Sequence, residues 1–103
     1  MKDRSSWTDE QINEEIAKKK GTYRPKTFLH FLGGWSDIPY IPDYTHDWQL
    51  GGELLEEIPF PFLHQRTVKL DWVCSRYDSY TAVTAPTPLR AICEEWLEWE
   101  EEK

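Results

Sequence analysis

Residues 68–97 read VKLDWVCSRYDSYTAVTAPTPLRAICEEWL, and this stretch decides the fold. Residues 68–72 alternate apolar and polar side chains, as a half-buried strand does, and residues 79–84 form a second run rich in strand-forming residues. Two prolines interrupt the strand pattern, and residues 89–97 then carry apolar side chains at helical spacing, with Thr87 as the N-cap. The sequence therefore predicts a β-hairpin that leads into an amphipathic helix.

A first helix is predicted near the N-terminus, over residues 8–20. Thr8 and Gln11 have the spacing of a capping box, in which each side chain binds the backbone N–H of the other residue. Gly21 follows the last helical residue and can adopt the left-handed conformation that ends a helix. Both ends of this helix are thus specified by local signals.

The middle of the chain predicts one strand and one helix. Residues 27–32 favour a strand, and two prolines then hold residues 38–44 in an extended path. A second helix is expected to begin at Thr45 or Asp47, either of which can act as the N-cap, and to run to Glu57.

The order of these elements predicts an α+β domain in which helices cover a small antiparallel sheet, an α/β/α sandwich-like arrangement. A chain of 103 residues is expected to form a single domain, residues 1–103. The expected core consists of residues on the apolar stripes: Ile12, Ile16, Leu54, Val68, Leu70, Ala91, Ile92 and Trp96.

Charge and cysteine content restrict the classes of partner. Twelve basic and nineteen acidic residues give a net charge of −7, which disfavours direct binding to nucleic acid or to an anionic membrane. No apolar run is long enough to span a membrane, and the first residues lack the apolar stretch of a signal peptide. We therefore expect a cytoplasmic protein in which Cys74 and Cys93 are buried, reduced thiols.

One polar cluster, Asp43 with His46 and Asp47, allows two interpretations. These side chains can form a turn and a helix cap, or they can perform acid–base chemistry. The turn and cap are favoured because the cluster lacks the paired histidines of a helical zinc site. No cysteine motif or glycine-rich phosphate loop is present either, so we expect no catalytic residue, no metal and no cofactor.

Two groups of residues are candidate binding surfaces. One is the acidic face of the last helix, formed by Glu94, Glu95 and Glu98 beside Trp99. It is either an ordinary solvated helix face or a docking surface for a basic partner. The other group is aromatic and spaced by glycine and proline, and either fills the core or forms an exposed patch: Phe28, Phe31, Trp35, Tyr40, Tyr44 and Trp48. From it we take Trp35, Tyr40 and Tyr44 as candidate binding residues.

Four motifs resemble the phage ABA sandwich domain family. They are residues 7–17 (WTDEQINEEIA), residues 41–47 (IPDYTHD), residues 54–57 (LLEE) and the closing pattern AxTPLxAICxxxL at residues 85–97. The resemblance covers most of the chain and implies α/β/α layering and a phage or prophage origin. The chain departs from the family pattern at residues 28–35 and 59–62, and the motifs carry no catalytic signature.

On the basis of this resemblance we expect a small accessory protein that binds a host protein in the bacterial cytoplasm. One specific form is a counter-defence inhibitor, for example of a CRISPR or other immune system. Two alternatives remain: a small-molecule-binding domain with the aromatic residues as its wall, and a minor hydrolytic enzyme that uses Asp43, His46 and Asp47. The sequence does not predict the oligomeric state.

Overall fold

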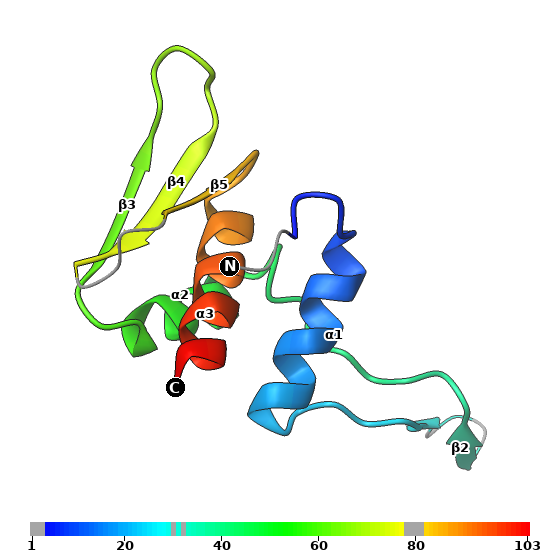
Figure 1. Cartoon of the computed structure of the whole chain (residues 1–103). Helices are drawn as coiled ribbons and strands as arrows, with labels where there is room; N and C mark the ends of the chain where they lie inside the picture. The colour runs from blue at the N-terminus through cyan, green and yellow to red at the C-terminus, as the bar shows by residue number, and fades with distance from the viewer. Residues whose placement is uncertain (1–3, 30, 32, 78–81) are drawn as a thin grey trace.

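The structure is a computed structural model that describes residues 4–29, 31, 33–77 and 82–103. In this part of the chain three helices and five strands follow one another, as Figure 1 shows: α1 (Asp9–Lys20), β1 (Thr27–Leu29), β2 (Gly34–Ser36), α2 (Trp48–Glu57), β3 (Pro61–Gln65), β4 (Trp72–Arg76), β5 (Ala82–Ala85) and α3 (Pro88–Glu102). The predicted α+β class is confirmed.

The ends of α1 match the sequence prediction closely. The Gln11 amide donates to Thr8 Oγ1 at 3.2 Å, and the Thr8 amide donates to Gln11 Oε1 at 2.8 Å, which completes the capping box. Gly21 ends the helix with a φ of 77°, a left-handed conformation that glycine adopts without a steric cost. The predicted helix over residues 8–20 is confirmed.

The caps of the other two helices are confirmed as well. Asp47, one of the two predicted candidates, accepts hydrogen bonds from the amides of Gln49 and Leu50 and starts α2. Thr87 accepts from the Arg90 amide at 3.2 Å and starts α3, with proline at its first position. These ends are set by short-range backbone hydrogen bonding, which a sequence displays directly.

The three-stranded sheet differs from the predicted hairpin. The antiparallel strand order is β3–β4–β5, with Leu63 opposite Cys74 and Cys74 opposite Val83. The strand predicted over residues 68–72 is wrong except at Trp72, and β3 was not predicted. The strand predicted over residues 79–84 coincides with β5 from residue 82, and its first three residues lie outside the described part.

The residues between β3 and β4 form the tip of the hairpin, and an ion pair closes its base. Arg66 Nε lies 2.6 Å from Asp71 Oδ1, and the Arg66 amide donates to the Asp71 carbonyl. Val68 and Leu70 therefore point into solvent, with 92% and 69% of their surfaces exposed, and Leu70 has a φ of 56°. Their predicted burial is wrong, because their alternating pattern belongs to a turn and not to a strand.

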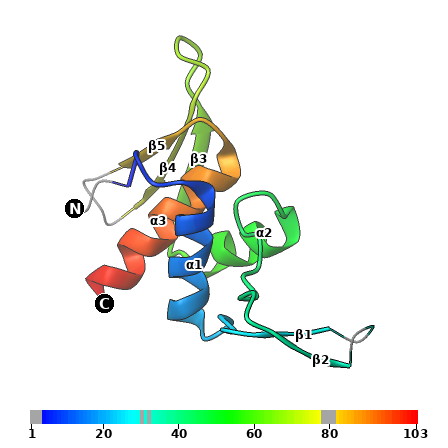
Figure 2. The same cartoon turned by 90° about the vertical axis from the view of Figure 1, so that its right-hand side faces the viewer.

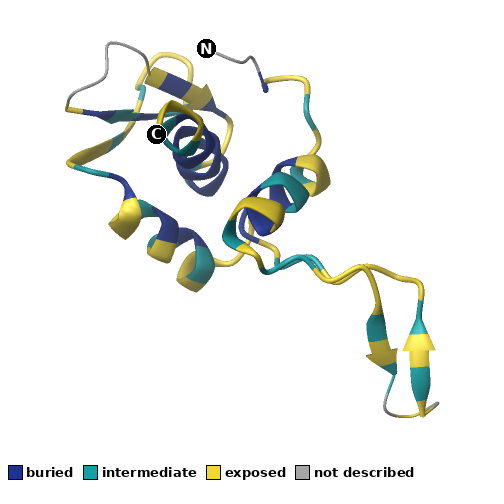
Figure 3. Cartoon of the chain, turned by 60° about the horizontal axis from the view of Figure 1, so that its bottom comes forward, coloured by how far each residue is buried: buried dark blue, intermediate teal, exposed yellow. Residues whose placement is uncertain are grey.

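The helix α3 lies at the centre of the molecule. One side packs on all three strands of the sheet, and its other sides pack on α1 and α2 (Figures 1 and 2). In the described part of the chain the helices thus lie on one side of this sheet, whereas the resemblance implies a sheet between two helical layers. Figure 3 shows α3 buried along most of its length. The other six predicted core residues are buried: Ile12, Ile16, Leu54, Ala91, Ile92 and Trp96.

A second, two-stranded hairpin projects from the helical body (Figures 2 and 3). We call residues 22–42 the arm. At its base the amides and carbonyls of Arg24 and Tyr40 exchange hydrogen bonds of 3.2 and 2.7 Å, and further out Phe28 lies opposite Trp35. The strand predicted over residues 27–32 includes β1, and its residues 30 and 32 lie outside the described part. The strand β2 was not predicted.

Candidate functional site

The acidic residues of α3 do not form an exposed surface. Glu94, Glu95 and Glu98 are all buried, with exposed fractions of 6%, 0% and 4%. The prediction of an exposed docking face at these positions is therefore wrong. The cause is the central position of α3, which buries the polar side of the helix as well as its apolar stripe.

Three arginines neutralise these carboxylates. Glu94 Oε2 lies 3.0 Å from Nε of Arg90, which belongs to α3 itself. The buried Oε1 of Glu95 lies 2.5 Å from Nε of Arg76 on β4. Oε1 of Glu98 lies 2.6 Å from Nη1 of Arg4 in the N-terminal segment. Two exposed or half-buried glutamates add further ion pairs, Glu101 to Arg4 and Glu102 to Arg76. The acidic run is thus an internal network that fixes the N-terminal segment and the sheet to α3.

Arg90 is the centre of one half of this network. Its guanidinium also lies 2.8 Å from Asp9 Oδ1 and donates to the carbonyls of Arg4 and Trp7 at 2.9 and 2.6 Å. Arginine suits such a site because its planar fork can donate to several acceptors at once. The sequence signal for this network was the presence of arginines that could pair with the acidic residues of the last helix. Which arginine pairs with which glutamate depends on the tertiary fold.

Glu95 is the most constrained of the buried acids. Burial raises its pKa to about 7, although its hydrogen bond from Arg76 acts in the opposite direction. Its second oxygen, Oε2, is buried without a hydrogen-bond partner among the described residues. The burial of Glu95 therefore opposes its ionisation, and this side chain is not accessible to a binding partner.

Trp99, the expected apolar anchor beside the acidic face, is half-buried against the core. Lys103 Nζ lies 3.8 Å from the centre of its indole ring, a cation–π distance. Trp99 contributes to the packing of the last turn of α3, and the glutamates that it was expected to accompany face inward.

The three aromatic candidates occupy different environments. Tyr44 is buried, with 2% of its surface exposed, and its hydroxyl lies 2.9 Å from Thr22 Oγ1. The prediction that Tyr44 belongs to a binding surface is therefore wrong. Trp35 and Tyr40 are exposed on the arm, with exposed fractions of 70% and 54%.

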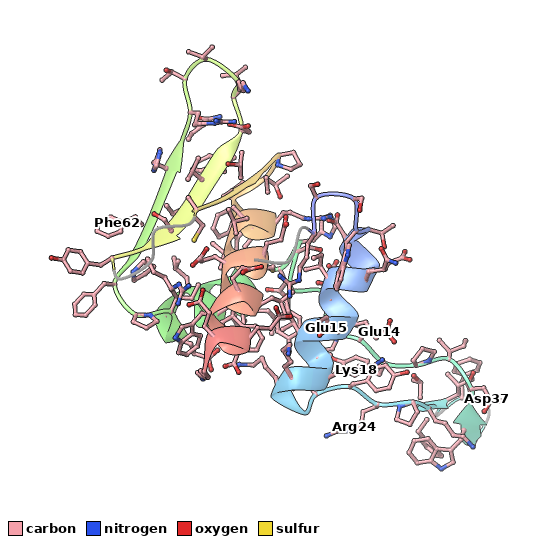
Figure 4. The ribbon with its side chains drawn as sticks, in the orientation of Figure 1. Glu14, Glu15, Lys18, Arg24, Asp37 and Phe62 are labelled. Atoms are coloured by element: carbon pink, nitrogen blue, oxygen red, sulfur yellow. The ribbon has the colours of Figure 1, made fainter. Side chains whose placement is uncertain are left out.

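The described residues of the arm expose several large apolar side chains. Trp35 packs edge-to-face on Phe28, with ring centres 5.3 Å apart, and Phe31 and Ile38 are also exposed. A shallow notch of about 430 Å³ lies beside the Trp35 ring and is lined by Arg24, Pro25 and Lys26 in addition to Trp35. Figure 4 shows Arg24 and Asp37 at opposite ends of the arm.

The Asp43 cluster forms a turn, as the favoured interpretation predicts. Asp43 Oδ1 accepts hydrogen bonds from Asn13 and Thr45 and lies 3.0 Å from Nδ1 of His46, while Asp47 caps α2. A groove of about 580 Å³ runs beside this turn and over the start of α1. The cluster thus joins α1 to the loop before α2.

The carboxylates around His46 favour its charged form. The hydrogen bond to Asp43 and the charge of that carboxylate raise the His46 pKa, and Asp9 Oδ2 lies 3.4 Å from its Nε2. Burial opposes ionisation of Asp43, but hydrogen bonds from His46, Asn13 and Thr45 outweigh it and lower the Asp43 pKa.

Neither cysteine is a nucleophile in this fold. Cys74 on β4 and Cys93 on α3 are free and fully buried, as expected. Burial raises the pKa of Cys74 to about 12 and raises that of Cys93 as well. Among the described residues, no group of histidine, cysteine and acidic side chains has the arrangement of a metal site.

Comparisons with known proteins add no relative. No protein-family model, curated protein or solved structure matches this chain. In the described residues, no helix is both long and apolar enough to cross a membrane.

Proposed function

We propose that this chain is a binding protein that uses the arm to contact another protein. The observation that carries the proposal is the exposure of Trp35, Tyr40, Phe31 and Ile38 on one projecting hairpin. Monomeric proteins seldom expose a contiguous apolar surface without a function for it. Tryptophan and tyrosine are also the residue types that contribute most to binding energy at protein interfaces.

The arm is held in a defined shape, which favours binding. The Arg24–Tyr40 backbone pair fixes its base, and the contact between Phe28 and Trp35 fixes the two strands to each other. A preformed surface loses little conformational entropy when a partner docks.

The side chains around Trp35 indicate what the partner presents. Arg24 and Lys26 line the notch beside the indole ring, and the acidic neighbour of Lys26 among the described residues is Asp37, at 3.8 Å. An apolar side chain of the partner flanked by a carboxylate would match this notch. A basic partner, which the acidic helix suggested, loses its support because those glutamates are buried.

We propose further that the partner belongs to a bacterial host and that the chain acts in the host cytoplasm as a phage or prophage accessory protein. Counter-defence, by inhibition of a CRISPR or other immune system, is the specific form. This part rests on the four motifs that resemble the phage ABA sandwich domain family. The net charge of −7 supports a protein rather than a nucleic-acid partner.

The two alternatives have weaker support. A hydrolytic enzyme would need a nucleophile beside its base, whereas His46 is hydrogen-bonded to Asp43 within the turn and Asp47 caps a helix. A small-molecule site normally encloses most of its ligand, but the Trp35 notch is lined from a single two-stranded hairpin.

The test compares three tagged proteins expressed in bacteria: wild type, Trp35→Ala and Trp48→Ala. Trp48 is the matched control, because it is an exposed tryptophan on α2, outside the arm. We expect a host protein to be retained by wild type and by Trp48→Ala, and to be lost with Trp35→Ala. In a strain with an active defence system, the same two proteins should restore phage plating.

Equal retention by all three proteins would contradict a role for the arm. Retention that depends on Trp35 without any effect on phage plating would support the binding surface and contradict counter-defence.

A further inference from the structure

The strand β3 is an edge strand whose outer side is open. Figure 1 shows β3 at the outside of the sheet, with β4 on its inner side only. Four of its five residues are exposed, and Leu63 is half-buried. In the described part of the chain no other strand pairs with β3.

The register shows which backbone groups point outward. The Tyr77 amide donates to the Phe60 carbonyl at 3.2 Å, and the Arg66 amide donates to the Asp71 carbonyl at 2.8 Å. In an antiparallel ladder the hydrogen-bonded residues alternate, so even-numbered residues of β3 bond to β4. The N–H and C=O groups of Leu63 and Gln65, and the C=O group of Pro61, therefore point away from the sheet.

This edge carries no charge, and its protection against pairing is limited to the prolines at its start. Residues 58–65 read IPFPFLHQ and contain no lysine, arginine or acidic residue in a chain rich in charge. Native edge strands generally carry charges or are covered, since an open edge is a template for another strand. The bulky Phe60, Phe62 and Tyr77 side chains are exposed beside it.

We propose that β3 pairs in antiparallel fashion with β3 of a second copy of this chain, with the two Leu63 residues opposite each other. This register overlaps the whole strand. Each Leu63 N–H then meets the carbonyl of the other Leu63, and each Gln65 N–H meets the carbonyl of the other Pro61. The proline nitrogen, which cannot donate, lies at the end of the ladder where its loss matters least.

Charge also matches across this two-fold axis. Phe62 of one copy comes opposite His64 of the other, and Phe60 comes opposite Arg66, which Asp71 leaves partly exposed. The Phe60 ring would thus face a guanidinium, a favourable combination, and the Phe62 ring would face an imidazole. No two like charges are brought opposite each other, even though each copy has a net charge of −7.

The dimer would leave the arm free. Figure 1 shows β3 and the arm at opposite ends of the molecule, so that the two arms of the dimer point away from the shared sheet. This inference is independent of the proposed function, because neither Trp35 nor the notch beside it takes part.

The first test is the mass in solution, measured by sedimentation up to about 1 mM protein. Gln65→Pro removes an outward N–H that the chain's own sheet does not use, and Gln65→Ala keeps it. We expect a dimer for wild type and for Gln65→Ala, and at least a tenfold weaker dimer for Gln65→Pro. Circular dichroism and thermal unfolding check that both variants are folded.

The second test fixes the register and does not depend on proline. Phe62→Cys and His64→Cys are made separately and oxidised alone or as a mixture. A disulfide-linked dimer is expected in the mixture and not in either variant alone, because position 62 faces position 64 across the axis. The native Cys74 and Cys93 are fully buried and do not compete.

A monomer at every concentration overturns the proposal. Cross-linking of His64→Cys with itself overturns the register, because it places the axis at residue 64. If wild type is a monomer and retains a host protein that Gln65→Pro does not retain, then the edge pairs with a strand of that protein. This outcome overturns self-pairing.

Discussion

Nε of Arg76 and Oε1 of Glu95 meet at 2.5 Å between β4 and α3, and both side chains are almost completely excluded from solvent. This contact places a charge pair where the sequence predicted an exposed acidic surface. Buried ion pairs add little net stability when intact, but the loss of one partner leaves a charge that solvent cannot reach.

Arg76→Met should therefore destabilise the fold strongly. At a pH above the wild-type Glu95 pKa, the variant must either bury a carboxylate without its cation or take up a proton, because Arg76 is the group that lowers this pKa. The expected cost is about 3–5 kcal/mol of unfolding free energy. The double variant Arg76→Met/Glu95→Leu removes both charges and should recover most of this loss. Urea denaturation measures both effects, and an exposed pair provides the control: Glu14→Gln, which breaks the contact with Lys18, should cost less than about 0.5 kcal/mol. An equal loss in the single and double variants would contradict the coupling.

The same carboxylate makes stability depend on pH. Burial raises the Glu95 pKa from 4.5 to about 7, so the native state holds a proton that the unfolded state has released. The stabilising effect of that proton is complete below 4.5 and is lost as the pH rises to about 7. Between about pH 5 and about pH 8, the unfolding free energy of wild type should fall more steeply than that of Glu95→Gln, so the two values diverge as the pH rises.

His46 is the necessary control for that experiment. Its pKa is raised too, by Asp43, so its contribution is also lost as the pH rises through its folded pKa. His46 is exposed and does not contact Glu95, so a His46→Gln background should leave the difference between wild type and Glu95→Gln unchanged. A difference that disappears in this background would assign the pH effect to His46.

The sequence predicted well what neighbouring residues determine. The caps Thr8, Asp47 and Thr87 each bind backbone amides two or three residues away, and all were identified. The pairing of Arg4 with Glu98 joins residues 94 positions apart, and no local pattern indicates it. The acidic helix was therefore interpreted by its composition alone, and its burial was missed.

The hairpin shows a second limit of sequence patterns. The alternation at residues 68–72 is typical of a strand, but the Arg66–Asp71 ion pair marks the end of the paired strands. Residues 67–70 therefore lie in the loop at the tip of the hairpin. The true strand β3 begins with a proline, which usually argues against a strand and is tolerated here because its nitrogen faces outward at an edge. For the candidate site, exposure of Trp35 and Tyr40 and burial of Tyr44 depend on where the arm leaves the body, which spacing does not reveal.

A pair of alanine substitutions tests the hairpin directly. Leu70→Ala should change the unfolding free energy by less than about 0.5 kcal/mol, because the side chain points into solvent. Ile92→Ala, at a fully buried position on α3, should cost about 2–5 kcal/mol. Chemical denaturation distinguishes the two, and a comparable loss for Leu70→Ala would place this residue back in the core.

Thiol reactivity tests the packing between the sheet and α3. Burial raises the pKa of Cys74 to about 12 and also raises that of Cys93, so few thiolates exist at neutral pH and reagents cannot reach them. We expect negligible labelling by an aromatic disulfide reagent in the native protein and complete labelling of both thiols in denaturant. Rapid labelling of either thiol in the native state would show that α3 separates readily from β4.

Two neighbouring glycines of α2 provide the sharpest test of its packing on α3. A Cβ atom added at Gly51 would lie 2.3 Å from Cδ2 of Leu89, a buried side chain, and 3.4 Å from the Tyr44 carbonyl oxygen. At Gly52 nothing lies within 4 Å of the added atom. Alanine favours a helix over glycine by about 1 kcal/mol at either position, so only the local space distinguishes them.

Gly52→Ala should therefore raise the unfolding free energy by up to about 1 kcal/mol. Gly51→Ala should lower it, since overpacking costs about 1–3 kcal/mol and outweighs the gain in helix propensity. Thermal and urea unfolding of the two single variants measure the difference between them. Leu89→Ala is itself destabilising, but on that background Gly51→Ala should become favourable because the clash is removed. If Gly51→Ala stabilises the wild-type protein as much as Gly52→Ala does, then α2 does not pack on α3 at this glycine as closely as the structure indicates.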